Sequence, residues 1–170
     1  MGLRCFKSTL YLYDMSNTSN LYIRLEMIWW LITAIVVIVV LFPIQQTLSN
    51  YPFYRANIIF IVGFITFTRY IFLLRYTFLG PLQILKVAIA FLMIPTTFLL
   101  VQEINHFQLF LDEEGLDALV GELPFGKREN MVGYIRAEML FFGTGVCIAA
   151  VVIIFRLLIS VWLLRNRGRI

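Results

Sequence analysis

Charged residues are scarce in this sequence of 170 residues: Asp, Glu, Lys and Arg make up 14% of it, whereas 61% of the residues are hydrophobic. Soluble domains carry about a quarter charged and about half apolar residues, so a soluble domain is not expected. Disorder is excluded, because disordered chains are poor in aromatic residues and this chain has 16 Phe, 8 Tyr and 3 Trp. The composition therefore predicts an integral membrane protein.

Cysteine and histidine are also rare. The two cysteines, Cys5 and Cys147, are far apart and form no disulfide framework, CxxC pair or zinc-ligand set. The single histidine, His106, follows Glu103 by three residues, so both share one face of a helix. Such a pair is half of a di-metal site, which needs a second copy and two further glutamates. We expect no cofactor and no metal, with Glu103 and His106 as weak candidates for a single ion.

Catalytic motifs are missing as well. The sequence has no phosphate loop, nucleophile elbow, haem motif or paired-histidine site, and no residue pattern identifies a family. No carboxylate is expected inside a membrane span, which argues against a proton-relay carrier. An enzyme is therefore not the expected class. The net charge of +4 is interpreted as membrane topology, with no nucleic-acid partner.

Four long hydrophobic runs predict four membrane-spanning helices, over residues 27–48, 56–78, 82–104 and 139–164. The first is about 33 Å long at about 1.5 Å per residue, enough to cross a hydrocarbon core of about 30 Å. The second is long enough only if Arg69 lies inside it. Leu79-Gly80-Pro81 predicts a tight turn before the third helix, and Pro95 predicts a kink within it. The expected fold is an all-α integral membrane four-helix bundle, a single domain over residues 1–170.

The distribution of basic residues predicts the orientation. Ten of the fourteen Lys and Arg residues fall on the side of the two termini and of the turn at residues 79–81. Basic residues favour the cytoplasm, and Trp29, Trp30 and Trp162 lie at the same boundary, as an aromatic belt does. We expect both termini in the cytoplasm and the protein in the plasma (inner) membrane. Met1 and Met15 are both candidate start residues.

Residues 105–138 are expected to form a loop on the outer side, between the third and fourth helices. Six apolar residues in it are spaced roughly for one helical face: Phe107, Phe110, Leu111, Leu116, Leu119 and Val120. The favoured interpretation is a short amphipathic helix lying on the outer membrane surface. The alternative is a docking surface for a partner on that side.

Four basic side chains are expected in the cytoplasmic half of the bilayer: Arg69, Arg75, Lys86 and Arg156. Charges at that depth are costly, so one hypothesis is that they bind anionic lipid headgroups or an acidic partner. The favoured alternative is that they snorkel to the headgroups and fix the orientation. Arg69 and Arg75 are six residues apart, about 120° around a helix, so they do not face one pocket. Glu26 is the acid expected to pair with one of the four.

Small residues mark a packing face on the fourth span. Gly143, Gly145 and Ala149 allow close approach, and Gly145 with Ala149 has small-xxx-small spacing. Packing within the bundle is favoured over self-association through this face. The expected function is a structural or accessory subunit of a membrane protein complex, partnered by the lipid bilayer and by another protein or a second copy. The alternative is a small oligomeric transporter or channel with a basic cytoplasmic mouth.

Overall fold

The chain folds into long helices. The computed structural model describes residues 2–48, 51–74, 77, 79, 82–115, 120 and 124–167, and of residues 2–22, 125, 164 and 167 it describes the backbone alone. The helices are α1 (Gly2–Thr47), α2 (Tyr54–Leu73), α3 (Gln83–Glu113) and α5 (Phe125–Arg167). Four segments of them are long and apolar enough to cross a membrane: Ile23–Thr47, Tyr54–Leu73, Gln83–Glu113 and Gly126–Leu163. The predicted all-helical, multi-pass architecture is confirmed.

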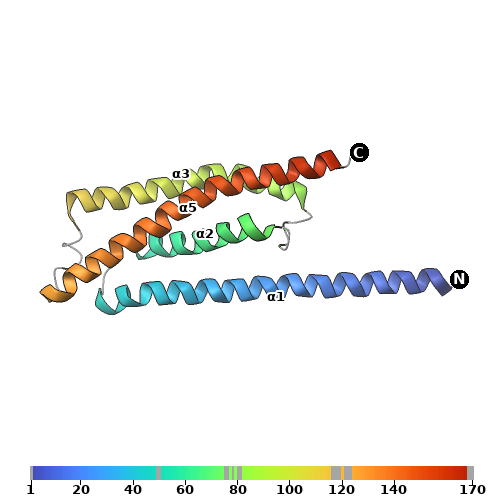
Figure 1. Cartoon of the computed structure of the whole chain (residues 1–170), viewed down its shortest axis with the longest axis horizontal. Coiled ribbons are helices and arrows are strands. Elements are labelled where there is room, and N and C mark those ends of the chain that lie inside the picture. Colours follow the sequence, from blue (N-terminus) through green and yellow to red (C-terminus); the bar gives the residue numbers. More distant parts are fainter. Residues whose placement is uncertain are drawn as a thin grey trace.

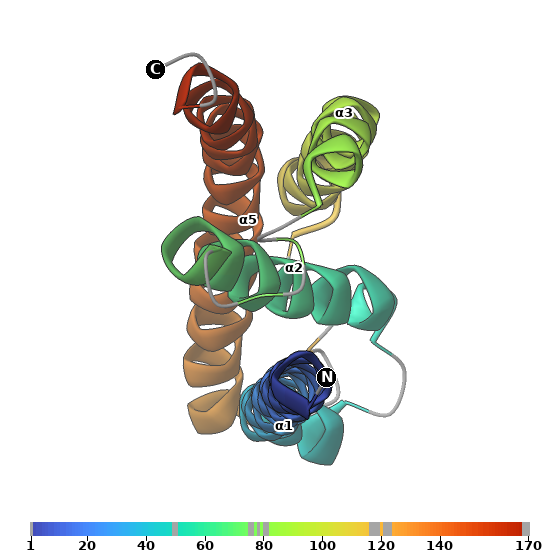
Figure 2. The ribbon, with the colours of Figure 1, turned by 90° about the vertical axis from the view of Figure 1, so that its right-hand side faces the viewer.

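The helices run alternately in opposite directions, so the N-terminal end of α1 and the C-terminal end of α5 lie at the same end of the bundle (Figure 1). We call this the terminal end and the other the loop end. Viewed along the bundle, α2 lies between α1 and α3, with α5 beside it (Figure 2). Helix α5 packs against both α2 and α3, whereas α1 packs mainly against α2. Three helices therefore form the core, and α1 lies on its flank.

Most residues of the predicted outer segment 105–138 lie in helices, while its place outside the membrane stays a prediction. Helix α3 continues to Glu113, and α5 begins at Phe125. Gly115 ends α3: it adopts φ 72°, and its N–H donates to the carbonyl of Phe110 at 3.2 Å. A left-handed glycine is a common way to end a helix. Leu116 and Leu119, assigned to the amphipathic surface helix, lie outside the described residues.

Helix α3 passes through Pro95 without a break. Proline lacks an N–H, so the carbonyl of Phe91 loses its helical hydrogen bond there. The hydroxyls of Thr96 and Thr97 donate to the neighbouring carbonyls of Leu92 at 2.9 Å and Met93 at 2.7 Å. The kink at Pro95 stays a prediction. Gly80 and Pro81, the predicted turn residues, lie outside the described residues.

Glycines bring α5 close to its neighbours. A Cβ atom added to Gly143 would lie 2.7 Å from Cδ1 of Ile104 on α3, and one added to Gly145 would lie 2.9 Å from the ring of Phe64 on α2. Contacts below about 3 Å are closer than carbon atoms pack. Ala149 is also buried. These small residues therefore pack against helices of the same chain, while self-association through Gly145 and Ala149 stays a prediction.

Candidate functional site: polar contacts between the helices

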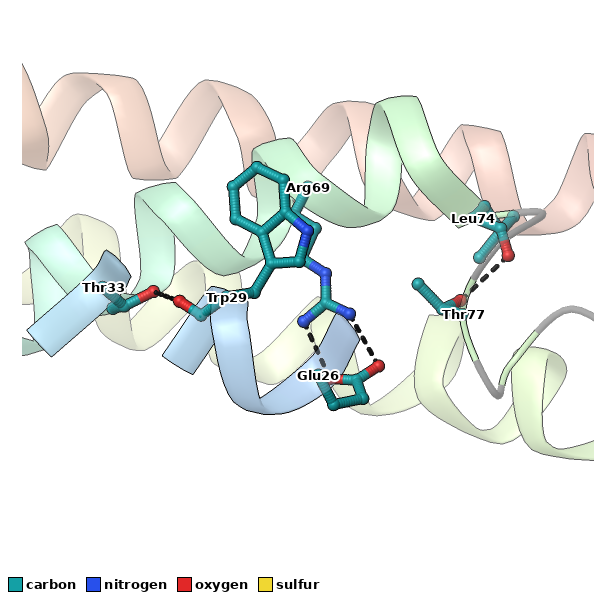
Figure 3. A network of polar contacts seen from close by, with 6 residues as sticks. All are labelled: Glu26, Trp29, Thr33, Arg69, Leu74 and Thr77. Atoms are coloured by element: carbon teal, nitrogen blue, oxygen red, sulfur yellow. Dashed lines mark hydrogen bonds and ion pairs between the residues drawn. The ribbon is translucent and has the colours of Figure 1, made fainter. Parts of the chain in front are cut away.

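An ion pair joins α1 to α2 toward the terminal end. Arg69 places Nη1 2.7 Å from Oε2 of Glu26 and Nη2 2.7 Å from Oε1 of the same carboxylate (Figure 3). Two parallel contacts of this kind form the strongest class of protein hydrogen bond. The guanidinium carbon also lies 5.6 Å from the ring centroids of both Trp29 and Tyr70, a cation–π distance. The prediction that Glu26 pairs with one of the basic residues is confirmed.

The space beside this ion pair is small. A cavity of about 20 Å³ lies between α1 and α2, and its lining includes Glu26, Thr33, Thr66 and Arg69. A cavity of that size holds about one water molecule. The hydroxyl of Thr33 donates to the carbonyl of Trp29 at 2.8 Å (Figure 3). The cavity has no room for a lipid headgroup, so the guanidinium of Arg69 binds Glu26 of α1 instead.

Lys86 and Arg156 contact other helices. Lys86 on α3 is only 1% exposed, and its Nζ lies 3.1 Å from the hydroxyl of Ser160 on α5. It is therefore buried against a neighbouring helix, and its snorkelling to the headgroups stays a prediction. Arg156 is exposed, and its Nε donates to the carbonyl of Ile71 at 3.3 Å. That carbonyl lies in the last turn of α2, where the helix supplies no partner of its own.

The three described members of the predicted basic set do not converge on one pocket. Arg69 faces α1, Lys86 contacts α5, and Arg156 reaches from α5 to the end of α2. Arg75 lies outside the described residues. Binding of anionic lipid by this set stays a prediction, and among its described members Arg156 has the exposed head such binding requires.

A second polar contact lies toward the loop end. The amide Nδ2 of Asn57 on α2 donates to Oε2 of Glu138 on α5 at 2.5 Å, and both side chains are buried. Glu138 lies inside the span Gly126–Leu163. The sequence interpretation placed Glu138 at the end of the outer loop, whereas the structure places it within α5, buried against α2. The missed signal was Asn57, a lone amide in an apolar helix, which predicts a hydrogen bond to a polar residue of another helix.

Two tyrosines lie near this contact. Burial raises the pKa of the Tyr51 hydroxyl, and the nearby Glu138 raises it further. Tyr134 on α5 donates its hydroxyl to the carbonyl of Val40 on α1 at 2.7 Å. The loop end therefore gathers polar side chains from α2, α5 and the segment before α2, around one buried carboxylate.

Glu103 and His106 both lie exposed on α3. The ring of His106 lies 5.7 Å from the ring centroid of Phe53, the residue before α2. Within the described part of the chain, no group of three His, Cys, Asp or Glu side chains is placed to hold a metal ion. The pair is therefore placed for contact with water or a headgroup, with Phe53 covering one side of the imidazole.

A wider groove of about 420 Å³ lies between α3 and α5 at the loop end. Its lining includes Gln108, Asp112 and Arg136, with Leu111, Val132 and Leu140 beside them. The charged side chains are exposed, whereas the apolar ones are partly buried. Among the described surfaces, this groove corresponds best to the docking surface that the sequence predicts on the outer side.

No protein-family model, curated protein or solved structure matches the chain. The four apolar helices are those of a multi-pass integral membrane protein. A finer role has to come from the contacts between them.

Proposed function

We propose that the protein is a structural or accessory subunit of a membrane protein complex. One observation carries the proposal: polar side chains within the spans join helices of the same chain. Glu26 and Arg69 join α1 to α2, Asn57 and Glu138 join α2 to α5, and Lys86 joins α3 to α5 through Ser160. Groups used in this way fix the arrangement of the helices, which is what a subunit that supports a partner requires.

Helix α1 is the element best placed for such a partner. It packs mainly against α2, and its span carries exposed apolar side chains: Leu31, Ile35, Ile38, Val39 and Phe42. Lipid covers such a face as well as protein does, so affinity has to come from close packing with a partner helix.

Native mass spectrometry of the tagged protein, purified in mild detergent, tests this function. We expect a stoichiometric complex with a different membrane protein. A photo-crosslinking residue at Ile38 should link to that protein, whereas the same residue at Ile84 of α3, also exposed, serves as the matched control. A homo-oligomer that carries anion flux after reconstitution would contradict the proposal.

Glu138 favours a second candidate function, the small oligomeric transporter or channel. Ionisable residues inside a span commonly mark an ion or substrate pathway. The basic residues toward the terminal end would attract anions to the cytoplasmic mouth, whereas Glu138 would favour a cation, so the flux of both kinds of ion is measured. Flux through vesicles that contain this protein alone distinguishes the two candidates, because an accessory subunit has none.

We also propose that both termini lie in the cytoplasm, with the protein in the plasma (inner) membrane. The excess of Lys and Arg on the side of the termini supports this orientation. In a variant without Cys5 and Cys147, we expect Glu114→Cys, in the turn after α3, to react with an impermeant maleimide added to intact cells. A cysteine tag on the carboxyl end should react only after lysis, and its labelling in intact cells would reverse the orientation.

A further inference from the structure

The buried contact at the loop end leaves three oxygen atoms without a hydrogen-bond partner among the described residues: Oη of Tyr51, Oδ1 of Asn57 and Oε1 of Glu138. The three side chains are 8%, 0% and 7% exposed, respectively. Asn57 touches Glu138 at 2.5 Å, and Tyr51 lies close enough to Glu138 for the two to interact electrostatically. Buried polar atoms in proteins almost always have a partner, so the unpartnered oxygens of the Asn57–Glu138 contact indicate a missing donor or cation, and the hydroxyl of Tyr51 is a third oxygen available to it.

The charges around Glu138 also indicate that a cation or donor is missing. Glu26, a partly buried carboxylate near the other end of the bundle, has Arg69 at 2.7 Å, whereas the partner that the buried Glu138 contacts is a neutral amide. Arg55 and Arg136 lie two residues from Asn57 and Glu138, and residues two apart on a helix face away from each other. Both arginines are exposed.

Among the described residues, the titratable groups on which Glu138 is found to act carry no positive charge. Tyr51 and Tyr134 are the groups on which Glu138 acts electrostatically, and both have neutral phenols. His106 on α3 is exposed and contacts the ring of Phe53. A buried carboxylate with no compensating charge is costly, so the cluster favours one added positive charge.

The donor atoms define the chemical class of that charge. A carboxylate, an amide carbonyl and a phenol are hard oxygen ligands, which suit alkali and alkaline-earth cations and not soft metals. A single carboxylate is neutralised by one unit of charge, so a divalent ion would leave a net charge of +1 buried in the span. The charge balance therefore favours a monovalent cation, for which a proton and Na⁺ are the two common sources.

We propose that Glu138, together with Asn57 and Tyr51, binds one monovalent cation, a proton or Na⁺, between α2 and α5. The two ions compete for the same carboxylate, so the site holds one of them at a time. Na⁺ would coordinate the oxygens together, whereas a proton would neutralise Glu138 and make one of its oxygens a donor to one neighbouring acceptor. Either ion removes the uncompensated charge and strengthens the contact between the helices. Because the ion binds the folded arrangement, its occupancy raises the stability of the protein.

Infrared spectroscopy and thermal unfolding of the full-length protein in lipid nanodiscs test the site. In choline chloride, a proton on Glu138 gives the carbonyl stretching band of a protonated carboxylic acid, and Glu138→Gln should lose this band. Replacing choline by Na⁺ at constant ionic strength should remove the band and raise the Tm if Na⁺ takes the site. If only the proton binds, the band should persist in Na⁺.

The matched control is Glu103→Gln, which removes an exposed carboxylate from the neighbouring helix and should leave both responses intact. Tyr51→Phe is the second variant, because it removes one oxygen and keeps the contact between Asn57 and Glu138. It should shift the carbonyl band or raise the Na⁺ concentration needed for half of the Tm change. The proposal is overturned if wild type and Glu138→Gln give the same spectra and Na⁺ and choline give equal Tm values.

Discussion

Replacing Arg69 with leucine is expected to destabilise the protein by about 3–5 kcal/mol, because the substitution leaves the partly buried carboxylate of Glu26 without its partner. The two ring contacts of the guanidinium, to Trp29 and Tyr70, are lost as well. Unfolding in mixed micelles by titration with a denaturing detergent measures the change. The lost free energy of unfolding should come from the contact between α1 and α2, where the ion pair lies.

The double variant Glu26→Leu/Arg69→Leu distinguishes the loss of the attraction within the ion pair from the cost of leaving the Glu26 carboxylate buried and unpaired. Replacing both members of a buried ion pair by apolar residues is often neutral or stabilising, so the double variant should recover most of the stability. Arg24→Gln is the control, since Arg24 is an exposed arginine two residues from Glu26. A single variant as stable as the double one would show that the ion pair contributes little.

Gly143→Leu is expected to have the second large effect. The added Cβ would lie 2.7 Å from Cδ1 of Ile104 on α3 and 3.3 Å from the ring of Phe60 on α2. Both side chains would have to move to admit the Cβ alone, and the rest of the leucine side chain needs further space. Overpacking of a well-packed core costs about 1–3 kcal/mol, and a clash with two helices at once places this variant at the upper end. The same detergent titration measures the loss.

Gly133→Leu in the same helix is the matched control, because a Cβ at Gly133 has no atom within 4 Å. It should not destabilise the protein, and the replacement of a helical glycine can raise stability by up to about 1 kcal/mol. If the two leucine variants unfold alike, the close approach of α5 to its neighbours does not hold the bundle together.

Hydropathy was sufficient to predict the four spans and the place of Arg69 inside the second. Helix length decided the second span, since the uncharged stretch before Arg69 is too short to cross a bilayer. The same reasoning found Glu26 as a partner, because few acids occur near that level in the sequence. Which basic residue it pairs with needed the structure, because only the packing of α1 on α2 selects Arg69 over Lys86.

The errors have a common cause. Hydropathy reports where a segment meets lipid, whereas a helix continues until its backbone is stopped, and α3 continues through polar residues as far as Glu113 before Gly115 ends it. Treating Glu138 as a loop residue followed from the same confusion and hid its contact with Asn57. A search for isolated polar residues in pairs of apolar helices would have suggested the pair.

Helix α1 is one unbroken helix from Gly2 to Thr47, and its N-terminal part projects beyond the other helices at the terminal end (Figure 1). At about 1.5 Å per residue the whole helix is about 69 Å long, more than twice the thickness of a hydrocarbon core of about 30 Å. Glu26, near the middle of this helix, joins it to α2. A pull on the N-terminal end of α1 would therefore act as a lever, and the ion pair of Glu26 with Arg69 would resist it.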